Sequence, residues 1–295
     1  DSRKPIVLDY GIRLIEAIDL EADTTLGTFY NWANHPETLW NKNLLLSSDF
    51  PHYLREGMEK GIYDGDSLIT TGLGGICVFA NGAIGGLMTT SPEFPIKDPF
   101  RDTSYLEPSF EKAAAQGFRL AQLGIEALAD SNDIIELTQS SIRLRAKTFE
   151  IPMDNSLYRL ASLFMLIDRG YSSWMKIRTE VAFWQLGPVS FLHYPGELYP
   201  EVLNGGVDKP NGQDYDLDPV EVPPLRELMP GEFKFSVGLS NDMIGYIIPK
   251  SEWDKAAPYI YDYEESPYGE INSVGPETGP LVYTHLKEVI LDLKE

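Results

Sequence analysis

The sequence predicts an α/β protein with a mixed-sheet core and flanking helices. Segments with the aromatic and β-branched composition of strands alternate along the chain with segments that repeat apolar residues at helical spacing. In addition, 43% of the 295 residues are hydrophobic, which is enough to form a sizeable core. We therefore expect one domain over residues 1–295, in which the stretch 204–231, rich in Pro, Gly and Asp, is a surface insertion loop.

Strands are predicted where aromatic and β-branched runs are bounded by turn residues. The run 25–33 ends at Asn34-His35-Pro36, and the run "GGICVFA" (74–80) has the pattern of a buried strand. The segment "EVAFWQLGPVSFLHY" (180–194) predicts a hairpin that turns at its Gly-Pro dipeptide, and "FKFSVGL" (233–239) predicts a further strand.

Four segments have the periodicity of helices. One begins at Asp49 as the N-cap and ends at Gly61, and another begins at Asn155 and ends at Gly170. A long helix over 110–130 and a C-terminal helix over 279–295 each have an apolar face. The residues on these faces are Ala114, Phe118, Ala121, Ile125 and Leu128 for the first, and Val282, Leu286, Val289 and Leu293 for the second.

The charge of the chain disfavours two classes of function. With 45 acidic and 24 basic residues, the formal net charge is −21. General binding to nucleic acid depends on Lys and Arg that neutralise phosphates, and binding to anionic lipid surfaces does so too, so both are disfavoured. No apolar run approaches 18 residues, so no transmembrane segment is predicted. The single cysteine, Cys77, excludes intrachain disulfides and is expected to be buried.

A glycine-rich segment, "FANGAIGGLMTT" (79–90), follows the strand predicted over 74–80. It places Gly82, Gly85 and Gly86 around a bend, with a spacing that differs from the dinucleotide-binding fingerprint, and it lacks the Lys of a P-loop. Both phosphate-binding hypotheses are therefore excluded. The segment predicts a strand followed by a turn whose backbone lies close to another element.

Two side chains at strand ends are candidates for chemistry. His35 ends an aromatic strand, where its side chain has a fixed direction, and Glu197 follows the Pro-Gly turn after the predicted hairpin. A carboxylate at such a turn is suited to bind a metal or accept a proton, and capping the turn is an equal alternative. His193 lies four residues before Glu197, about 13 Å away in an extended strand, so these two need not meet. His285, on the C-terminal helix, is expected on a solvated face.

Six segments resemble, in the same order, motifs of the neutral/alkaline ceramidase superfamily. They match its histidine-proline turn, the segment after that turn, a strand-turn that reads GDVSP or GDINP, the PGE turn, the GL[SA]N…GY segment, and the segment that closes the catalytic domain. In this sequence the six are "NWANHPETL", "LLLSSDFPHYLREGMEK", "FANGAIGGLMT", "YPGELYPE", "VGLSNDMIGYIIPKSEW" and "SVGPETGPLVYTHLKEV". Together they cover the chain from about residue 5 to its end.

The resemblance implies that this chain is the C-terminal portion of a larger catalytic domain with the activity of a zinc-dependent amidase. The zinc ligands of that family are two histidines, a glutamate and a tyrosine. Matched motif by motif, His35 corresponds to one histidine, Glu197 to the glutamate and Tyr246 to the tyrosine. A water activated by the zinc ion would attack the amide.

Two departures from the family pattern affect the implied site. The other zinc histidine of the family lies in an upstream His-Thr-His type of motif that this chain lacks, so the resemblance implies an N-terminal companion fragment or chain. The aspartate and serine of GDVSP align with Gly86 and Met88, which are only positional equivalents of catalytic residues. The transition-state tyrosine of the family falls near Tyr259, with Tyr261 as the alternative register.

Two main functions remain open at this point. The first is a zinc-dependent hydrolase that cleaves an amide, or as second choice an ester, in a linear small-molecule or lipid-like substrate. The second is a non-catalytic binding or assembly subunit that retains the fold, which the missing histidine and Met88 favour; an unrelated α/β binding protein is a third. Because the chain starts at Asp1 without Met, we also expect a proteolytically processed protein, secreted or periplasmic.

Overall fold

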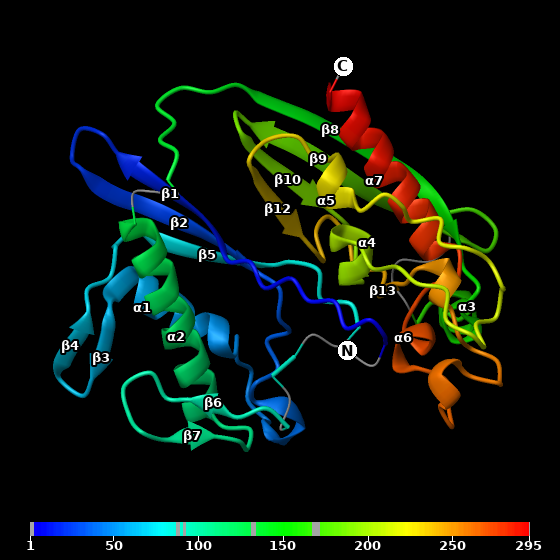
Figure 1. Cartoon of the computed structure of the whole chain (residues 1–295), viewed down its shortest axis with the longest axis horizontal. Helices are drawn as coiled ribbons and strands as arrows, with labels where there is room; N and C mark the ends of the chain where they lie inside the picture. Colours follow the sequence, from blue (N-terminus) through cyan, green and yellow to red (C-terminus); the bar gives the residue numbers. More distant parts are fainter. Residues whose placement is uncertain (1–2, 87–88, 91–92, 131–133, 167–171, 295) are drawn as a thin grey trace. The chain divides into compact units, whose positions relative to one another are not determined.

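The computed structural model confirms a mixed α/β class and describes residues 3–86, 89–90, 93–130, 134–166 and 172–294 (Figure 1). The chain forms two compact units, and each is described here by itself. Unit 1 consists of residues 1–9, 81–87 and 139–295, and unit 2 consists of residues 10–80 and 88–138. The expectation of one domain over the whole chain stays a prediction.

Unit 2 is built on a three-stranded sheet in the order β1-β2-β5, with β1 and β2 antiparallel. Two short antiparallel hairpins, β3-β4 and β6-β7, contact the helices α1 and α2 of this unit. The elements are β1 (Arg13–Asp19), β2 (Thr24–Trp32), η1 (Trp40–Lys42), α1 (Phe50–Lys60), β3 (Ile62–Asp64), β4 (Ser67–Thr70), β5 (Ile76–Asn81), β6 (Ile96–Lys97), β7 (Ser104–Tyr105) and α2 (Phe110–Ala129).

The core of unit 2 lies between this sheet and the helices α1 and α2. Tyr30 of β2, Phe50 and Leu54 of α1, and Leu120 of α2 are buried together with Cys77 of β5, as expected for this cysteine. The Tyr30 hydroxyl donates a hydrogen bond to the Leu120 carbonyl (2.9 Å). The one polar group of this aromatic side chain is therefore satisfied inside the core.

Helix α1 has the predicted start and stop signals. The Asp49 carboxylate accepts a hydrogen bond from the Phe50 N–H (2.7 Å), and Gly61 ends the helix with φ of 98°. By contrast, the prediction that the strand over 74–80 is fully buried was wrong. Ile76 and Val78 are exposed, so β5 has only one buried face, which is the pattern of an edge strand with one side in water.

The predicted face of the long helix α2 was only partly correct. Ala121 is buried as expected, but Gly117 lies so close to α1 that a Cβ there would be 2.5 Å from the Phe50 carbonyl oxygen. On α1, a Cβ at Gly57 would likewise lie 2.5 Å from the Ala121 Cβ. Small residues bring the two helices together, and a pattern of large apolar residues does not reveal them.

Unit 1 is built on a four-stranded sheet in the order β12-β10-β9-β8, in which β10 pairs parallel with β12 and the other pairs are antiparallel. The predicted hairpin is confirmed as β9 and β10, with Leu186 opposite Val189. The elements are β8 (Ile142–Pro152), α3 (Ser156–Leu163), β9 (Lys176–Leu186), β10 (Val189–His193), β11 (Glu197–Leu198), α4 (Pro200–Asn204), α5 (Leu225–Leu228), β12 (Phe233–Val237), β13 (Tyr246–Ile247), η3 (Lys250–Glu252), η4 (Ile260–Asp262), α6 (Tyr268–Ile271) and α7 (Thr278–Lys294).

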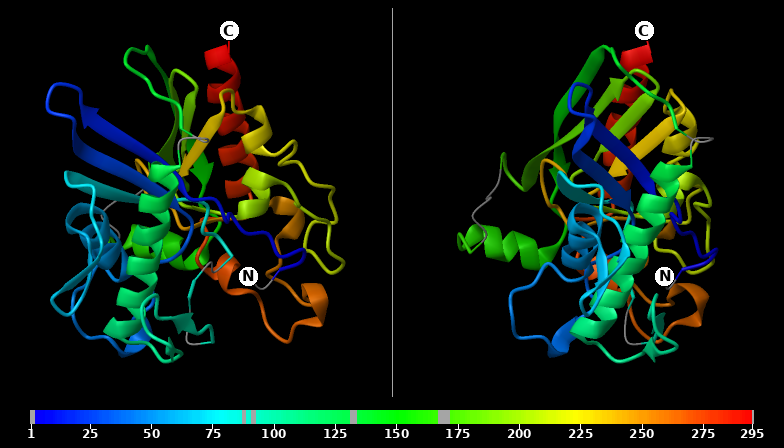
Figure 2. Two further views of the ribbon diagram at one scale, coloured as in Figure 1. Left: turned by 60° about the vertical axis from the view of Figure 1, so that its left-hand side comes forward. Right: turned by 90° about the vertical axis from the view of Figure 1, so that its left-hand side faces the viewer.

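Helix α7 lies along β8 and β9 and covers the core of unit 1 (Figure 2). Its predicted apolar stripe is confirmed, because Val282, Leu286, Val289 and Leu293 are all buried. Against them pack residues of β9 and β10 such as Val181, and residues of the short strands β11 and β13 such as Leu198 and Ile247. The core therefore extends under the strand ends that carry the predicted site residues.

The predictions for helix α3 and for the stretch 204–231 of unit 1 are each confirmed only in part. Helix α3 begins at the predicted N-cap, Asn155, but it ends at Leu163, and the predicted stop at Gly170 lies outside the described residues. The stretch 204–231 contributes no strand among its described residues, yet Leu225 and Met229 within it are buried in the core. Within the described part of the chain, no helix combines the length and the apolar character needed to cross a bilayer.

Candidate functional site

Two predicted site residues, Glu197 and Tyr246, lie side by side in unit 1. Glu197 is the first residue of β11 and Tyr246 is the first residue of β13, and these two strands run parallel with Glu197 opposite Tyr246. The Glu197 N–H donates to the carbonyl of Gly245, directly before β13 (3.0 Å). The backbone ladder therefore places a carboxylate next to a phenol.

Glycines at the start of both strands make this pairing possible. A Cβ atom at Gly196 would lie 2.3 Å from the Gly245 carbonyl oxygen, and one at Gly245 would lie 2.0 Å from the Asn272 carbonyl oxygen. Gly245 also has φ of 83°, which favours glycine. The two glycines next to the candidate ligands are therefore required because backbone packs directly against backbone.

Tyr246 is a buried phenol that bonds to its neighbour across the ladder. Its hydroxyl donates a hydrogen bond to the Glu197 carboxylate, and only 5% of the residue is exposed. Burial, followed by the negative charge of Glu197, raises the pKa of Tyr246 above its ordinary range. The tyrosine is therefore neutral in this arrangement, and a cation placed between the two oxygens would favour its ionised form.

Three further tyrosines surround this pair, and the sequence analysis did not single them out. The ring centroids of Tyr199 and Tyr268 lie 6.1 and 5.9 Å from that of Tyr246, both in edge-to-face geometry. Tyr158 of α3 packs against the core cluster that contains Tyr246. The three come from separate elements, so no spacing along the sequence could have grouped them.

The glycine-rich segment runs beside β11 within unit 1. The Gly85 N–H donates to the Leu198 carbonyl (2.9 Å), and a Cβ at Gly85 would lie 2.7 Å from the Glu197 carbonyl oxygen. The predicted close approach of this segment to another element is confirmed. Gly86 is buried and turns the chain with φ of 80°, while Met88 lies outside the described residues.

The predicted tyrosine of the transition state lies elsewhere in unit 1. Tyr259 directly precedes η4, with its carbonyl against Gly212, and the hydroxyl of Tyr261 donates to the Lys4 carbonyl (2.7 Å). The tyrosine whose ring meets Tyr246 is instead Tyr268. The catalytic role of Tyr259 stays a prediction.

His35, the third predicted ligand, lies in unit 2. It forms a parallel bridge with Thr89, its carbonyl accepts a hydrogen bond from the Asn34 side chain (3.0 Å), and its Nδ1 atom is 4.0 Å from a Glu37 carboxylate oxygen. Its side chain is largely buried and held by local contacts. Its role as a ligand together with the residues of unit 1 stays a prediction.

The two remaining histidines of unit 1 have structural roles. Nε2 of His193 accepts a hydrogen bond from the Trp184 indole (2.8 Å), and its Nδ1 lies 2.7 Å from the Ser240 hydroxyl. Burial lowers the pKa of His193 to about 4, so this residue is neutral at pH 7. His285 was expected on a solvated face, but it packs on Phe149, with ring centroids 4.2 Å apart.

The donor chemistry of Glu197 and Tyr246 fits part of a metal site. Carboxylate and phenolate oxygens are hard donors, and a carboxylate is a common zinc ligand. No group of three or more His, Cys, Asp or Glu side chains that could hold a metal occurs among the residues described here. The pair therefore fits two of the four ligands that the resemblance implies, and the remaining two would have to come from histidines.

A cavity of about 460 Å³ lies near the backbone of Tyr246, because Ser273, which bonds to the Tyr246 carbonyl, lines it. Its lining includes Asn155, Glu270 and Ser273, and the Ser273 hydroxyl donates to the Tyr246 carbonyl (2.7 Å). Neither Glu197 nor Tyr246 is among the lining residues. We therefore place the candidate chemistry at the pair of side chains, which carries the donor atoms, and not in the cavity.

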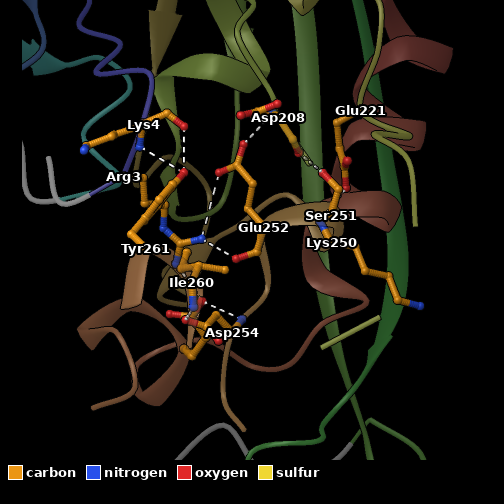
Figure 3. A network of polar contacts seen from close by, with 11 residues as sticks. Arg3, Lys4, Asp208, Glu221, Lys250, Ser251, Glu252, Asp254, Ile260 and Tyr261 are labelled. Atoms are coloured by element: carbon orange, nitrogen blue, oxygen red, sulfur yellow. Dashed lines mark hydrogen bonds and ion pairs between the residues drawn. The ribbon is translucent and has the colours of Figure 1, made fainter. Parts of the chain in front are cut away.

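Buried carboxyl groups gather beside this site around a single guanidinium (Figure 3). Arg3 donates to the Glu252 backbone carbonyl and to the Glu270 carboxylate, both at 2.6 Å, and its guanidinium lies 4.9 Å from the centre of the Tyr199 ring. Glu201 is buried next to Glu252. Because acids outnumber this cation, some of these carboxyl groups must stay protonated.

One consequence is a pH-dependent stability that Glu201 controls. Burial, followed by the charge of Glu252, raises the pKa of Glu201 well above its ordinary 4.5. The folded state keeps a proton that the unfolded chain releases, so this contribution to stability is complete below pH 4.5 and is lost as the pH rises through the raised pKa. Relative to Glu201→Gln, we expect the unfolding free energy of the wild type to fall by up to about 1.4 kcal/mol per pH unit.

Urea denaturation of both proteins at steps from pH 5 to pH 8 measures this difference. The contribution of His193 cancels because both proteins contain it. Parallel stability curves for the two proteins would show that Glu201 does not hold the proton.

By fold, the chain is a ceramidase-like α/β protein. A crystal structure of neutral ceramidase from Pseudomonas aeruginosa superimposes with a TM-score of 0.60 at 15% identity, over 95% of this chain and 46% of that chain. A structure titled ceramidase complexed with C2 matches with a TM-score of 0.62 at 14% identity, over 99% of this chain and 50% of that chain. The chain thus spans about half the length of these structures, and the resemblance predicted from the motifs is confirmed for the fold. No family model and no curated protein sequence matches it.

Proposed function

We propose that this chain carries three of the four ligands of the metal site of a ceramidase-like hydrolase that cleaves an amide bond. The observation that supports the proposal most is the pairing of Glu197 with Tyr246 across the ladder of β11 and β13. These are the two residues of unit 1 that the family motifs mark as zinc ligands. His35 and a further histidine from an N-terminal companion complete the proposed ligand set.

The residues of the chain have distinct tasks in the proposed site. Zinc, when bound, supplies a Lewis acid that activates water near neutral pH. Glu197 supplies a charged oxygen, and Tyr246 supplies a phenol that is oriented by its hydrogen bond to that carboxylate. The ring of Tyr268 packs edge to face against Tyr246 and limits its rotation. Gly196 and Gly245 keep the two strand starts at contact distance.

The alternative is a non-catalytic binding or assembly subunit with the same fold. One observation favours it: Gly86 stands where the family turn has an aspartate, so the corresponding carboxylate is missing. Zinc binding distinguishes the two functions, because a subunit without chemistry has no need of the ligand pair.

The proposal is tested by zinc binding and hydrolysis in Glu197→Gln and Tyr246→Phe. We expect the loss of a direct ligand to weaken zinc binding by at least about 100-fold, more than the loss of a supporting residue does. Hydrolysis of a short-chain fatty amide should fall in parallel. The control is Glu232→Gln, which removes an exposed carboxylate just before β12 of the same unit and should change neither quantity.

The measurements are equilibrium dialysis with elemental analysis, and release of the amine product. Both are made on the chain alone and with the N-terminal companion added. Zinc binding that is equal in Glu197→Gln and the wild type would overturn the proposed ligand, and a wild type that binds no zinc in the presence of the companion would favour the non-catalytic subunit.

A further inference from the structure

Helix α3 has one face on its unit and an apolar face in solvent. Tyr158 packs against the core of unit 1, and the Ser162 hydroxyl lies 3.8 Å from the Met153 sulfur, so these residues mark the inner face. The outer face and the end of the helix are apolar and exposed. The apolar tip, as we call it, is Leu163, Phe164, Met165 and Leu166, which are 61, 65, 89 and 79% exposed.

The apolar tip is a formed helix end with its hydrogen bonds in place. The Met165 N–H donates to the Ser162 carbonyl (3.1 Å) and the Leu166 N–H to the Ala161 carbonyl (2.8 Å), which is the pattern of a Schellman cap. Glycine is the usual residue at the left-handed position of this cap, yet here Met165 takes it with φ of 55°. A large apolar side chain is thus kept, against the backbone preference, at the most exposed point of the tip.

The base of α3 is attached to the candidate site. The Asn155 side chain, which caps the helix, donates to the carbonyls of Ile271 and Ser273 (2.8 and 2.9 Å). Ser273 in turn donates to the carbonyl of Tyr246 (2.7 Å). With Tyr158 packed against the core cluster that contains Tyr246, the same short helix has the candidate site on its inner side and the apolar tip on its outer side.

The charges near α3 indicate the kind of surface that it fits. Arg159 pairs with Asp154 (2.6 Å), and Lys176, at the start of β9, pairs with Glu150 (3.6 Å). The charges of these two pairs are therefore balanced, although the chain as a whole carries −21. A neutral surface with apolar material beneath it complements such a face, whereas an anionic surface is repelled by the chain.

We propose that the apolar tip docks the protein on the surface of a neutral, zwitterionic lipid aggregate and so brings the candidate site to substrates dissolved in lipid. This inference rests on the proposed function, because it names the phase in which the amide substrate is presented. The side chains of the tip enter the boundary between headgroups and acyl chains, and the hydrogen bonds of Asn155 and Ser273 link the docked helix to the site.

The test is binding to phosphatidylcholine vesicles, measured by co-sedimentation of the full chain. Met165→Gly removes the most exposed side chain and also supplies the residue that the cap prefers, so the variant should fold at least as stably as the wild type. We expect it to bind vesicles roughly tenfold more weakly, because one buried side chain of this size contributes about that factor. Phe164→Ser should lower binding by a similar factor.

Two controls distinguish docking through the tip from non-specific adsorption to vesicles and from the proposed hydrolysis. Leu44→Ser with Leu46→Ser removes two leucines of unit 2 that are more exposed than the residues of the tip, and it should leave vesicle binding unchanged. Zinc binding should be the same in Met165→Gly and the wild type. Hydrolysis of an amide embedded in vesicles should fall in Met165→Gly, while hydrolysis of a water-soluble amide should not.

The outcomes distinguish this inference from the proposed function. A wild type that does not bind phosphatidylcholine vesicles, or a Met165→Gly variant that binds them equally well, overturns the docking surface and leaves the zinc site standing. Sedimentation that shows a dimer in the wild type and a monomer in Met165→Gly also overturns it, because the occupant is then a second copy. Vesicle binding through the tip without zinc binding supports docking and overturns the proposed hydrolase.

Discussion

Replacement of Arg3 by methionine is expected to lower the free energy of unfolding by about 3–5 kcal/mol at pH 8, the usual cost of removing one partner of a buried ion pair. Arg3 is 2% exposed, and its guanidinium faces the buried carboxylate of Glu270 and the backbone carbonyl of Glu252. Methionine has a similar length, so packing is largely kept. What the variant loses is the positive charge that stabilises the ionised carboxyl groups around it.

The pH dependence of this loss identifies its cause. Arg3 lowers the pKa values of Glu252 and Glu270, which burial raises. Without Arg3 these groups take up protons more readily, so the loss should be smaller at pH 5 than at pH 8. The neighbouring Lys4→Met serves as the control, since Lys4 is exposed, and it should cost less than about 0.5 kcal/mol.

Chemical denaturation at pH 5 and pH 8 gives both values. A second test is the double variant Arg3→Met with Glu270→Gln, which removes the carboxylate that Arg3 contacts and should recover part of the loss at pH 8. A loss that is equal at both pH values and is not recovered in the double variant would show that Arg3 acts through packing alone.

Replacement of Gly245 by alanine is expected to have the second large effect, on both stability and the candidate site. A Cβ atom there would lie 2.0 Å from the Asn272 carbonyl oxygen, and the backbone has φ of 83°. The strained backbone costs about 1–2 kcal/mol, and the displacement that the clash requires should bring the total to about 3–5 kcal/mol. Because Tyr246 is the next residue, its hydroxyl should move away from Glu197, and zinc binding should weaken.

Gly74→Ala separates the clash from the backbone strain. Gly74 has nearly the same φ, 82°, but open space around the position of a Cβ, so only the strain applies and the loss should stay near 1–2 kcal/mol. Thermal unfolding and zinc titration of the two variants provide the comparison. Equal losses in both variants would mean that the contact with Asn272 relaxes without cost.

Many local features of the fold could be predicted from the sequence because neighbouring residues cause them. Asp49 and Gly61 bound α1 through their own hydrogen bonds and backbone angles, and a Gly-Pro turn joins β9 to β10. For two helices, distant contacts explain where the predictions were wrong. Gly117 belongs to the buried face of α2 because α1 approaches it, and His285 is covered by Phe149 of β8.

The candidate site divides in the same way. The motifs marked Glu197 and Tyr246 one at a time, and the glycine-rich segment indicated a close approach of backbone to another element. The parallel pairing of β11 with β13, the hydrogen bond from Tyr246 to Glu197 and the ring of Tyr268 appear only when distant segments meet. Tyr268 contacts Tyr246 because tertiary packing places α6 there, and the role of Tyr259 stays a prediction.

The fold class, the ends of several helices and strands, and the residue types available for chemistry depend on neighbours along the chain, so they could be predicted from local patterns. The glycines that cannot be replaced, such as Gly85 and Gly245, became evident from the folded structure, since a Cβ clashes there with segments far away in sequence. The folded structure also brings the Arg3 guanidinium to the buried carboxyl groups of Glu252 and Glu270, about 250 residues away in the chain. It leaves the apolar end of α3 exposed to solvent. Burial and close contact between distant segments set these properties, and no local pattern specifies them.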